Sequence, residues 1–322
     1  MARAALVICL AFIVGQASAR ESLRIGLQTT GTVAWLVDVI QRHELDRAAD
    51  LELTIVNLAS PDAAKLALNG GAVDVAVTDW LWVARERALG AKLQFYPYSS
   101  AVGAVMTKGD SPLRTIADLK GHVLAVAGGP LDKSWLIVQG ASLREGVDLR
   151  HAAKLEFGAP PLIFEKTLQG EPEASLNFWN FCARLEARGF RRLLDVSDAE
   201  LELGLKEPIA LTGFAFSEDF AKAHANAVDH FLAAARKADE ILLQSDAEWE
   251  ALRPLMKAED EATFSIYRTR TREGVPRRPI EAEEADAAAL FKTLASLGGP
   301  ALVGPALTLD PGLYYHPASG GG

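Results

Sequence analysis

Three short segments of the sequence place small, hydroxyl and polar residues where a strand is expected to give way to a helix. These residues are Gln28, Thr30, Gly31 and Thr32 in the first segment, Thr78, Asp79 and Trp80 in the second, and Gly128, Gly129 and Ser134 in the third. The first amides of a helix have no partner within the helix, so they can donate to an oxygen of a bound molecule. Each segment alone is also consistent with an ordinary turn. Together they predict a site of non-covalent ligand binding.

Aromatic residues accompany these segments and suggest one property of the ligand. Trp80 and Trp135 follow expected strand ends, and Trp179 with Asn180 follows another. A tryptophan offers a flat apolar wall with one N–H donor, which suits an apolar or ring-shaped molecule. Packing in the core is the competing interpretation for each tryptophan.

The charge of the ligand stays open at this point. Asp79 and Asp132 would repel an anion unless they cap helices or face away. A carboxylate beside tryptophans equally suits a cationic or amine-bearing ligand.

Motifs of catalysis do not occur in the sequence. H-E-x-x-H, G-x-S-x-G, a P-loop and a G-x-G-x-x-G segment after a strand are all missing. Cys182 lies in an aromatic run, where we interpret it as a small buried hydrophobic residue. We therefore expect no enzyme, no catalytic residue and no cofactor. A metal site of histidine and cysteine is not expected either, and a site of carboxylates alone stays open.

The first nineteen residues have the layout of a secretory signal peptide. Arg3 precedes an apolar run over residues 4–14, and Ala17-Ser18-Ala19 forms an A-x-A cleavage site. The apolar run is too short to span a bilayer, which needs about 20 residues. We predict cleavage after Ala19 and a periplasmic mature protein.

The balance of charge argues against some partners. Removal of residues 1–19 takes away Arg3 and no acidic residue, which leaves 32 basic against 42 acidic side chains. This acidic balance argues against nucleic acid or an anionic membrane surface as a partner. We expect a monomer.

Strands and helices alternate along the mature chain. The expected strands are residues 23–27, 51–56, 73–77, 122–127, 155–157, 176–178 and an extended run over 209–216. Capping residues mark several helix starts, including Ser60 before Pro61, the pair Thr115 and Asp118, and Ser217. This alternation predicts an α/β fold of two doubly wound lobes joined by a two-segment hinge.

The expected boundaries place one lobe inside the other. Lobe 1 takes residues 20–104 and 216–316, and lobe 2 takes residues 105–215. The chain is expected to cross between them at 105–108 and 212–216, and residues 317–322 to form a disordered glycine-rich tail.

Three stretches of the chain resemble a known family, and the first is the expected strand 23–27 with the polar turn that follows it. Residues 66–75 (LALNGGAVDV) are similar to its L-x-x-G-x-(I/V)-D passage, and residues 111–121 (SPLRTIADLKG) match its (D)SP-I-x-(S/T)-x-A-D-L-K-G signature. On these motifs the chain resembles the nitrate/sulfonate/taurine branch of periplasmic ABC-transporter substrate-binding proteins. The sequence departs from that pattern at 78–80, where many relatives have Thr-Gly-Asp/Asn, and at 168–174.

The resemblance implies a type II periplasmic binding protein fold and a role in import. Such a protein captures a small organic molecule, sulfonate- or carboxylate-like or aromatic, in the cleft between its lobes. Its partners would be an ABC permease and an ATPase subunit. The alternative is a periplasmic binding or accessory protein for a sensor or an enzyme, with a cationic or metal-associated ligand, because a fold does not fix a function.

Overall fold

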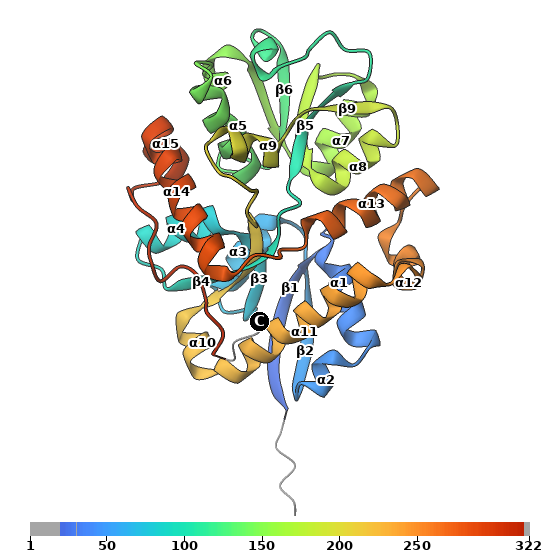
Figure 1. Ribbon diagram of the computed structural model, residues 1–322, viewed down its shortest axis with the longest axis vertical. Coiled ribbons are helices and arrows are strands. Elements are labelled where there is room, and N and C mark those ends of the chain that lie inside the picture. The colour runs from blue at the N-terminus through green and yellow to red at the C-terminus, as the bar shows by residue number, and fades with distance from the viewer. Residues whose placement is uncertain (1–19, 30, 319–322) are drawn as a thin grey trace, which may run out of the picture.

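The computed structural model describes residues 20–29 and 31–318. It consists of two lobes stacked end to end, each built around a five-stranded sheet with helices on its faces (Figure 1). The predicted α/β two-lobe fold is confirmed. The proposed signal peptide, Thr30 and the tail from Ser319 lie outside the described residues.

The first sheet has the strand order β2-β1-β3-β10-β4. Its strands are β1 (Glu21–Gln28), β2 (Leu51–Leu58), β3 (Val75–Asp79), β4 (Leu93–Ser99) and β10 (Thr212–Ser217). β1 pairs in parallel with β2 and β3, whereas β10 runs antiparallel to β3 and β4. The carboxyl ends of β1, β3 and β4 therefore meet at one edge of the sheet, where ligands bind in open α/β sheets.

The second sheet has the strand order β7-β6-β8-β5-β9. Its strands are β5 (Gly103–Lys108), β6 (Val123–Ala127), β7 (Lys154–Gly158), β8 (Ala174–Phe178) and β9 (Phe190–Asp195). β6 is parallel to β7 and β8, and β5 is antiparallel to β8 and β9. Each sheet thus has the same pattern, with one antiparallel strand that adjoins a crossing of the chain.

The chain crosses from the first sheet to the second at residues 100–102 and returns within 203–211. The crossings expected from the sequence lie slightly later, at 105–108 and 212–216. Both of these segments are strands, β5 and β10, and each is paired on both sides within its own sheet. Ladder hydrogen bonds hold these residues inside the lobes, so the short segments before them do the crossing.

Side-chain caps begin several of the helices where the sequence predicts them. Ser60 accepts from the amide of Ala63, Ser217 caps the helix after β10, and Thr115 with Asp118 forms a capping box. The helices are α1 (Val33–Arg42), α2 (Leu45–Ala48), α3 (Pro61–Asn69), α4 (Trp80–Ala88), η1 (Ile116–Leu119), α5 (Lys133–Arg144), α6 (Leu149–Ala152), α7 (Pro160–Gln169), α8 (Trp179–Glu186), α9 (Val196–Glu202), α10 (Glu218–Ala223), α11 (Ala225–Gln244), α12 (Asp246–Met256), α13 (Glu261–Gly274), α14 (Ile280–Gly298) and α15 (Pro300–Val303).

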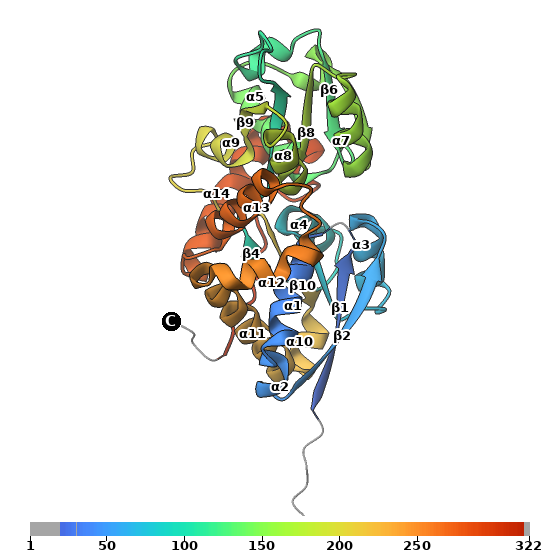
Figure 2. The same ribbon diagram turned by 90° about the vertical axis from the view of Figure 1, so that its right-hand side faces the viewer.

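The C-terminal helices contact both lobes. α13 packs against α8 and α14 packs against α5, although α8 and α5 belong to the second lobe (Figures 1 and 2). One buried apolar cluster joins Trp80 of the first lobe, Trp135 of the second and Leu294 of α14. The last third of the chain therefore ties the lobes together on one side.

The end of the described chain is also fixed. The amide of Ala318 donates to Asp229, and the Tyr315 hydroxyl donates to the same carboxylate. Ala318 and Pro317, which the sequence assigned to the disordered tail, thus have defined positions.

Candidate functional site

A cavity of about 130 Å³ lies between the two sheets and is lined from both lobes. The first lobe contributes the turn after β1, the end of β3 and the start of α3. The second lobe contributes the start of α5 and the start of α8. Of the residues predicted for the site, those that line this cavity are Gln28, Gly31, Thr32, Thr78, Asp79, Trp179 and Asn180.

The turn after β1 is held in place by hydrogen bonds within the first lobe. The amide of Gly31 donates to the carbonyl of Gln28 at 2.9 Å, and the Gln28 side chain donates to the carbonyl of Val77 at 3.4 Å. Thr32 then begins α1 without a side-chain cap. The Thr32 side chain therefore leaves the first-turn amides of α1 uncapped.

Asp79 lines the cavity and also caps α4. Its Oδ1 accepts from the amide of Trp82 at 2.7 Å, and its Oδ2 lies 4.0 Å from the Lys65 ammonium. Lys65 in turn lies over the Trp82 ring, 5.5 Å from the centroid. Beside Asp79, the buried hydroxyl of Thr78 has no hydrogen-bond partner within residues 20–29 and 31–318. A buried hydroxyl without a partner is costly, so this atom is suited to a polar group that enters the cavity.

Asp132 is the corresponding residue of the second lobe. Its Oδ1 accepts from the amides of Ser134 at 2.9 Å and Trp135 at 3.4 Å, and so caps α5. Burial raises the pKa of the Asp132 carboxyl; Lys133 lowers it, and the charge of Asp79 raises it further. The negative charge of Asp79 in the first lobe therefore acts on Asp132 in the second.

The aromatic walls of the cavity come mainly from the second lobe. Phe178 carries the Lys133 ammonium over its ring at 4.9 Å from the centroid. Trp179 is 9% exposed and meets Trp35 and Tyr267 edge-to-face, at centroid distances of 5.9 and 5.7 Å. Trp179 thus closes the cavity on one side and packs against the first lobe on the other.

Five predicted site residues do not line the cavity, and packing explains why. Trp80 and Trp135 are 0% and 1% exposed; the first packs against Phe291 and the second against Phe157. Asp79 caps α4 and Asp132 caps α5, and both aspartates line the cavity. Each helix then directs its tryptophan into the core.

Ser134 is also buried, and the two glycines act indirectly. Ser134 is 1% exposed and contributes its amide to the Asp132 cap. Gly128 has φ +91°, and a Cβ there would lie 3.1 Å from the Asp132 carboxylate. Gly128 thus makes room for Asp132, while Gly129, like Gly128, lies outside the lining.

Several lining residues were not predicted from the sequence as part of the site. Lys65, Tyr98, Lys133 and Thr212 line the cavity, as does Asp132, whose charge alone had been considered. A signal for Asp132 was its place before the expected helix, typical of a cap. Lys65 lies on the same face of α3 as Pro61, four residues earlier. This face lines the cavity only because α3 packs beside the end of β3, which the sequence does not reveal.

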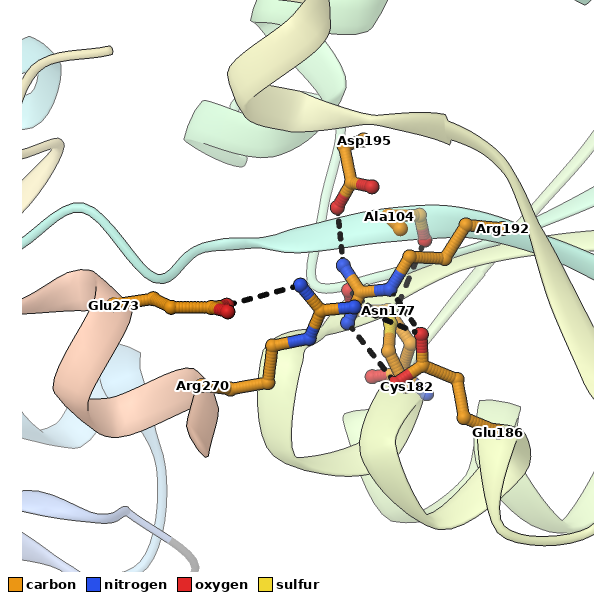
Figure 3. A network of polar contacts seen from close by, with 8 residues as sticks. All are labelled: Ala104, Asn177, Cys182, Glu186, Arg192, Asp195, Arg270 and Glu273. Atoms are coloured by element: carbon orange, nitrogen blue, oxygen red, sulfur yellow. Dashed lines mark hydrogen bonds and ion pairs between the residues drawn. The ribbon is translucent and has the colours of Figure 1, made fainter. Parts of the chain in front are cut away.

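Behind the cavity, ion pairs join α8 of the second lobe to α13. Glu186 on α8 pairs with Arg192 on β9 and, at 3.3 Å, with Arg270 on α13, which also pairs with Glu273 at 3.1 Å (Figure 3). Arg192 further pairs with Asp195. Through the Glu186–Arg270 pair, this network joins the second lobe to α13.

Two searches of the described residues gave negative results. Within 20–29 and 31–318, three or more histidine, cysteine or acidic side chains do not gather in a way that could hold a metal ion. Over the same residues, none of the helices has the length and apolar character needed to cross a membrane.

Solved structures of periplasmic binding proteins share this fold. The periplasmic aliphatic sulphonate binding protein SsuA from Escherichia coli has a TM-score of 0.72 and 20% identity over 94% of each chain. The alkanesulfonate-binding protein SsuA from Xanthomonas axonopodis pv. citri, bound to MOPS, has a TM-score of 0.68 and 22% identity over 90% of this chain and 98% of that one. A Candida albicans protein with the generic periplasmic binding protein fold has a TM-score of 0.61 and 15% identity, covering 86% and 90%.

Sequence comparison is consistent with this result and adds the family. No curated protein matched the sequence. The NMT1/THI5-like family model matches residues 47–248, which is more than half of the chain. The resemblance to periplasmic substrate-binding proteins that the motifs at 66–75 and 111–121 predicted is thereby confirmed. The chain belongs to the NMT1/THI5-like family.

Proposed function

We propose that this protein is an extracytoplasmic solute-binding protein that captures a small organic molecule for ABC-type import. The observation that carries the proposal is the cavity between the lobes, lined by strand ends and helix starts from both sheets. A ligand that contacts both lobes stabilises the closed arrangement, and so shifts the population toward it. The coupled partners would be a membrane permease and its ATPase.

The proposed location follows from the N-terminal sequence. The signal peptide over residues 1–19 would direct the chain to the periplasm, where the mature protein would act as a monomer.

The walls of the cavity suggest a ligand with a flat or apolar body. Phe178, Trp179 and Tyr98 supply apolar surface, and polar or charged side chains from both lobes line the rest of the cavity. Aromatic walls combined with converging polar groups are typical of sites for small organic molecules.

The decisive experiment is identification of the bound solute. The protein purified without denaturation from its own cells should release one small molecule in mass spectrometry. That molecule, added back, should raise the midpoint of thermal unfolding with the logarithm of its concentration. Deletion of the gene should slow uptake of the same molecule.

A variant that fills the cavity provides the control. Ala34 lines the cavity at the start of α1, whereas Ala233 is exposed on α11. Ala34→Phe should abolish the ligand-induced shift while circular dichroism stays unchanged, and Ala233→Phe should keep the full shift. Absence of any bound solute, with no shift from any component of the growth medium, would contradict the proposal.

A further inference from the structure

The chemical class of the ligand can be inferred from the acidic side chains of the cavity, an inference that rests on the proposed function. We infer that the cavity binds a positively charged nitrogen group, a protonated amine or amidine, between Asp79 of the first lobe and Asp132 of the second. Such a group would bridge the lobes and so favour closure. The sulfonates named in the matched structures are anions, so this inference sets the chain apart from those proteins.

Both carboxylates are fixed before any ligand arrives. Asp79 accepts from the amide of Trp82 at 2.7 Å, and Asp132 accepts from the amide of Ser134 at 2.9 Å. In each case one oxygen holds the helix start and the carboxylate still lines the cavity. Their positions are therefore set by the backbone of α4 and α5, and a bound donor would need little rearrangement of the protein.

The same caps remove the amides that an anion would use at these two helix starts. An oxyanion at a helix N-terminus is held by free first-turn amides. At α4 and α5 a carboxylate of the protein already occupies that place and repels a second negative charge. An anionic group is thus disfavoured on this side of the cavity.

Basic side chains near the two carboxylates do not fully compensate for them. The Lys65 ammonium lies 4.0 Å from the Asp79 carboxylate and also over the Trp82 ring. Lys133 lies over Phe178 and, among the described residues, forms no ion pair within 4.0 Å of Asp132. Arg85 also interacts electrostatically with Asp79, but it donates to the carbonyl of Leu302 and does not line the cavity. Among the described residues Asp132 thus has no ion pair within 4.0 Å, although the charge of Lys133 lowers its pKa, and a cationic ligand could supply that ion pair.

Thr78 provides an independent indication of a hydrogen-bonding ligand. Its residue is 8% exposed, its Oγ1 has no partner among the described residues, and it adjoins Asp79 on the lining. A protonated amine has up to three N–H donors, and the two carboxylates and this hydroxyl supply three acceptors. The site thus matches a nitrogen group with at least two donors.

The test compares three probes with the same ring. Benzylamine carries a cation, benzenesulfonate carries an anion, and aminomethyl-benzenesulfonate carries both. Calorimetry gives the affinity of the protein for each probe. Benzylamine and the zwitterion should bind more tightly than benzenesulfonate. Asp132→Asn keeps an N-cap of equal quality while removing the charge. It should weaken binding of both amines by about 10- to 100-fold, the loss expected for one charge-assisted hydrogen bond.

A matched control separates charge in the cavity from capping. Asp260 caps α13 through the amide of Thr263 away from the cavity, so Asp260→Asn should leave all three affinities unchanged. If Asp132→Asn does not fold, the pH dependence of benzylamine binding to the unaltered protein decides, because it should weaken in acid.

The outcomes distinguish this inference from the proposed function. Preference for benzenesulfonate, unchanged amine affinity in Asp132→Asn, or an anionic co-purified solute without an amine would overturn the inference and leave solute binding intact. Failure of every probe together with the absence of a co-purified solute would overturn both.

Discussion

Asp239 offers a test of how burial of one carboxylate limits the stability of the first lobe. It lies on α11 and lines a second cavity of about 340 Å³, under the segment that connects α13 to α14. Among the described residues the carboxylate has no ion pair, although Arg236 and Arg277 line the same cavity. Burial raises the pKa of Asp239 from the ordinary 3.8 to about 7. Folding therefore opposes its ionisation.

The magnitude follows from the displaced pKa. Each unit corresponds to about 1.36 kcal/mol, so ionised Asp239 destabilises the folded state by at most about 4 kcal/mol, and by about 2 kcal/mol if solvent screens the carboxylate. The penalty is absent below the unfolded pKa, grows as pH rises, and is complete above about pH 7, where the folded carboxyl also ionises.

Asp239→Asn removes this penalty, and urea unfolding at two pH values measures it. The variant should gain stability over the unaltered protein, and the gain should be about 1 to 3 kcal/mol larger at pH 8 than at pH 5. Glu240→Gln is the matched control, because Glu240 is exposed on the same helix and pairs with Lys237. A gain in Asp239→Asn that is equal at the two pH values would refute the reasoning.

Three further predictions test the packing and the site. Binding of an amine should weaken as pH falls through the raised pKa of Asp132, because protonation removes its charge, whereas an anion should bind better; calorimetry from pH 8 to pH 4 distinguishes the two. Gly140→Val should cost about 1 to 3 kcal/mol in urea unfolding, since even a Cβ at this position would lie 2.6 Å from Leu294. Trp80→Phe should lower the midpoint of thermal unfolding and leave ligand affinity unchanged, because Trp80 is fully buried outside the cavity.

The elements of the fold were predictable where local chemistry sets them. Ser60, Thr115 and Ser217 cap helices in the structure as the sequence indicates, because a cap needs only the next three residues. Asp260 caps the start of α13 in the same way, whereas Pro279 before α14 offers no side-chain cap. The positions of both helices depend on packing against α8 and α5, which lie more than 70 residues earlier in the chain.

The site was predictable to the level of the turn and less well to the level of the side chain. From the first predicted turn Gln28, Gly31 and Thr32 line the cavity, and from the second Thr78 and Asp79 do. Whether Asp79 or Trp80 faces it depends on the angle at which α4 leaves the sheet, and tertiary packing sets that angle. The sequence also gives no sign that Lys65 would reach the same place as Asp79, because only the packing of α3 against β3 brings them together.

The helix α14 constrains the path by which a molecule can reach the interior. Leu290 and Leu294 share one dry cluster with residues of both halves, and a wide rotation would wet them at about 25 cal/mol per Å². A narrow parting at the opposite rim avoids that penalty. Ligand exchange with the solvent should therefore require only a limited opening of the cleft. The width of that opening, and not a large rotation of the lobes, then sets the size of the largest ligand that can enter.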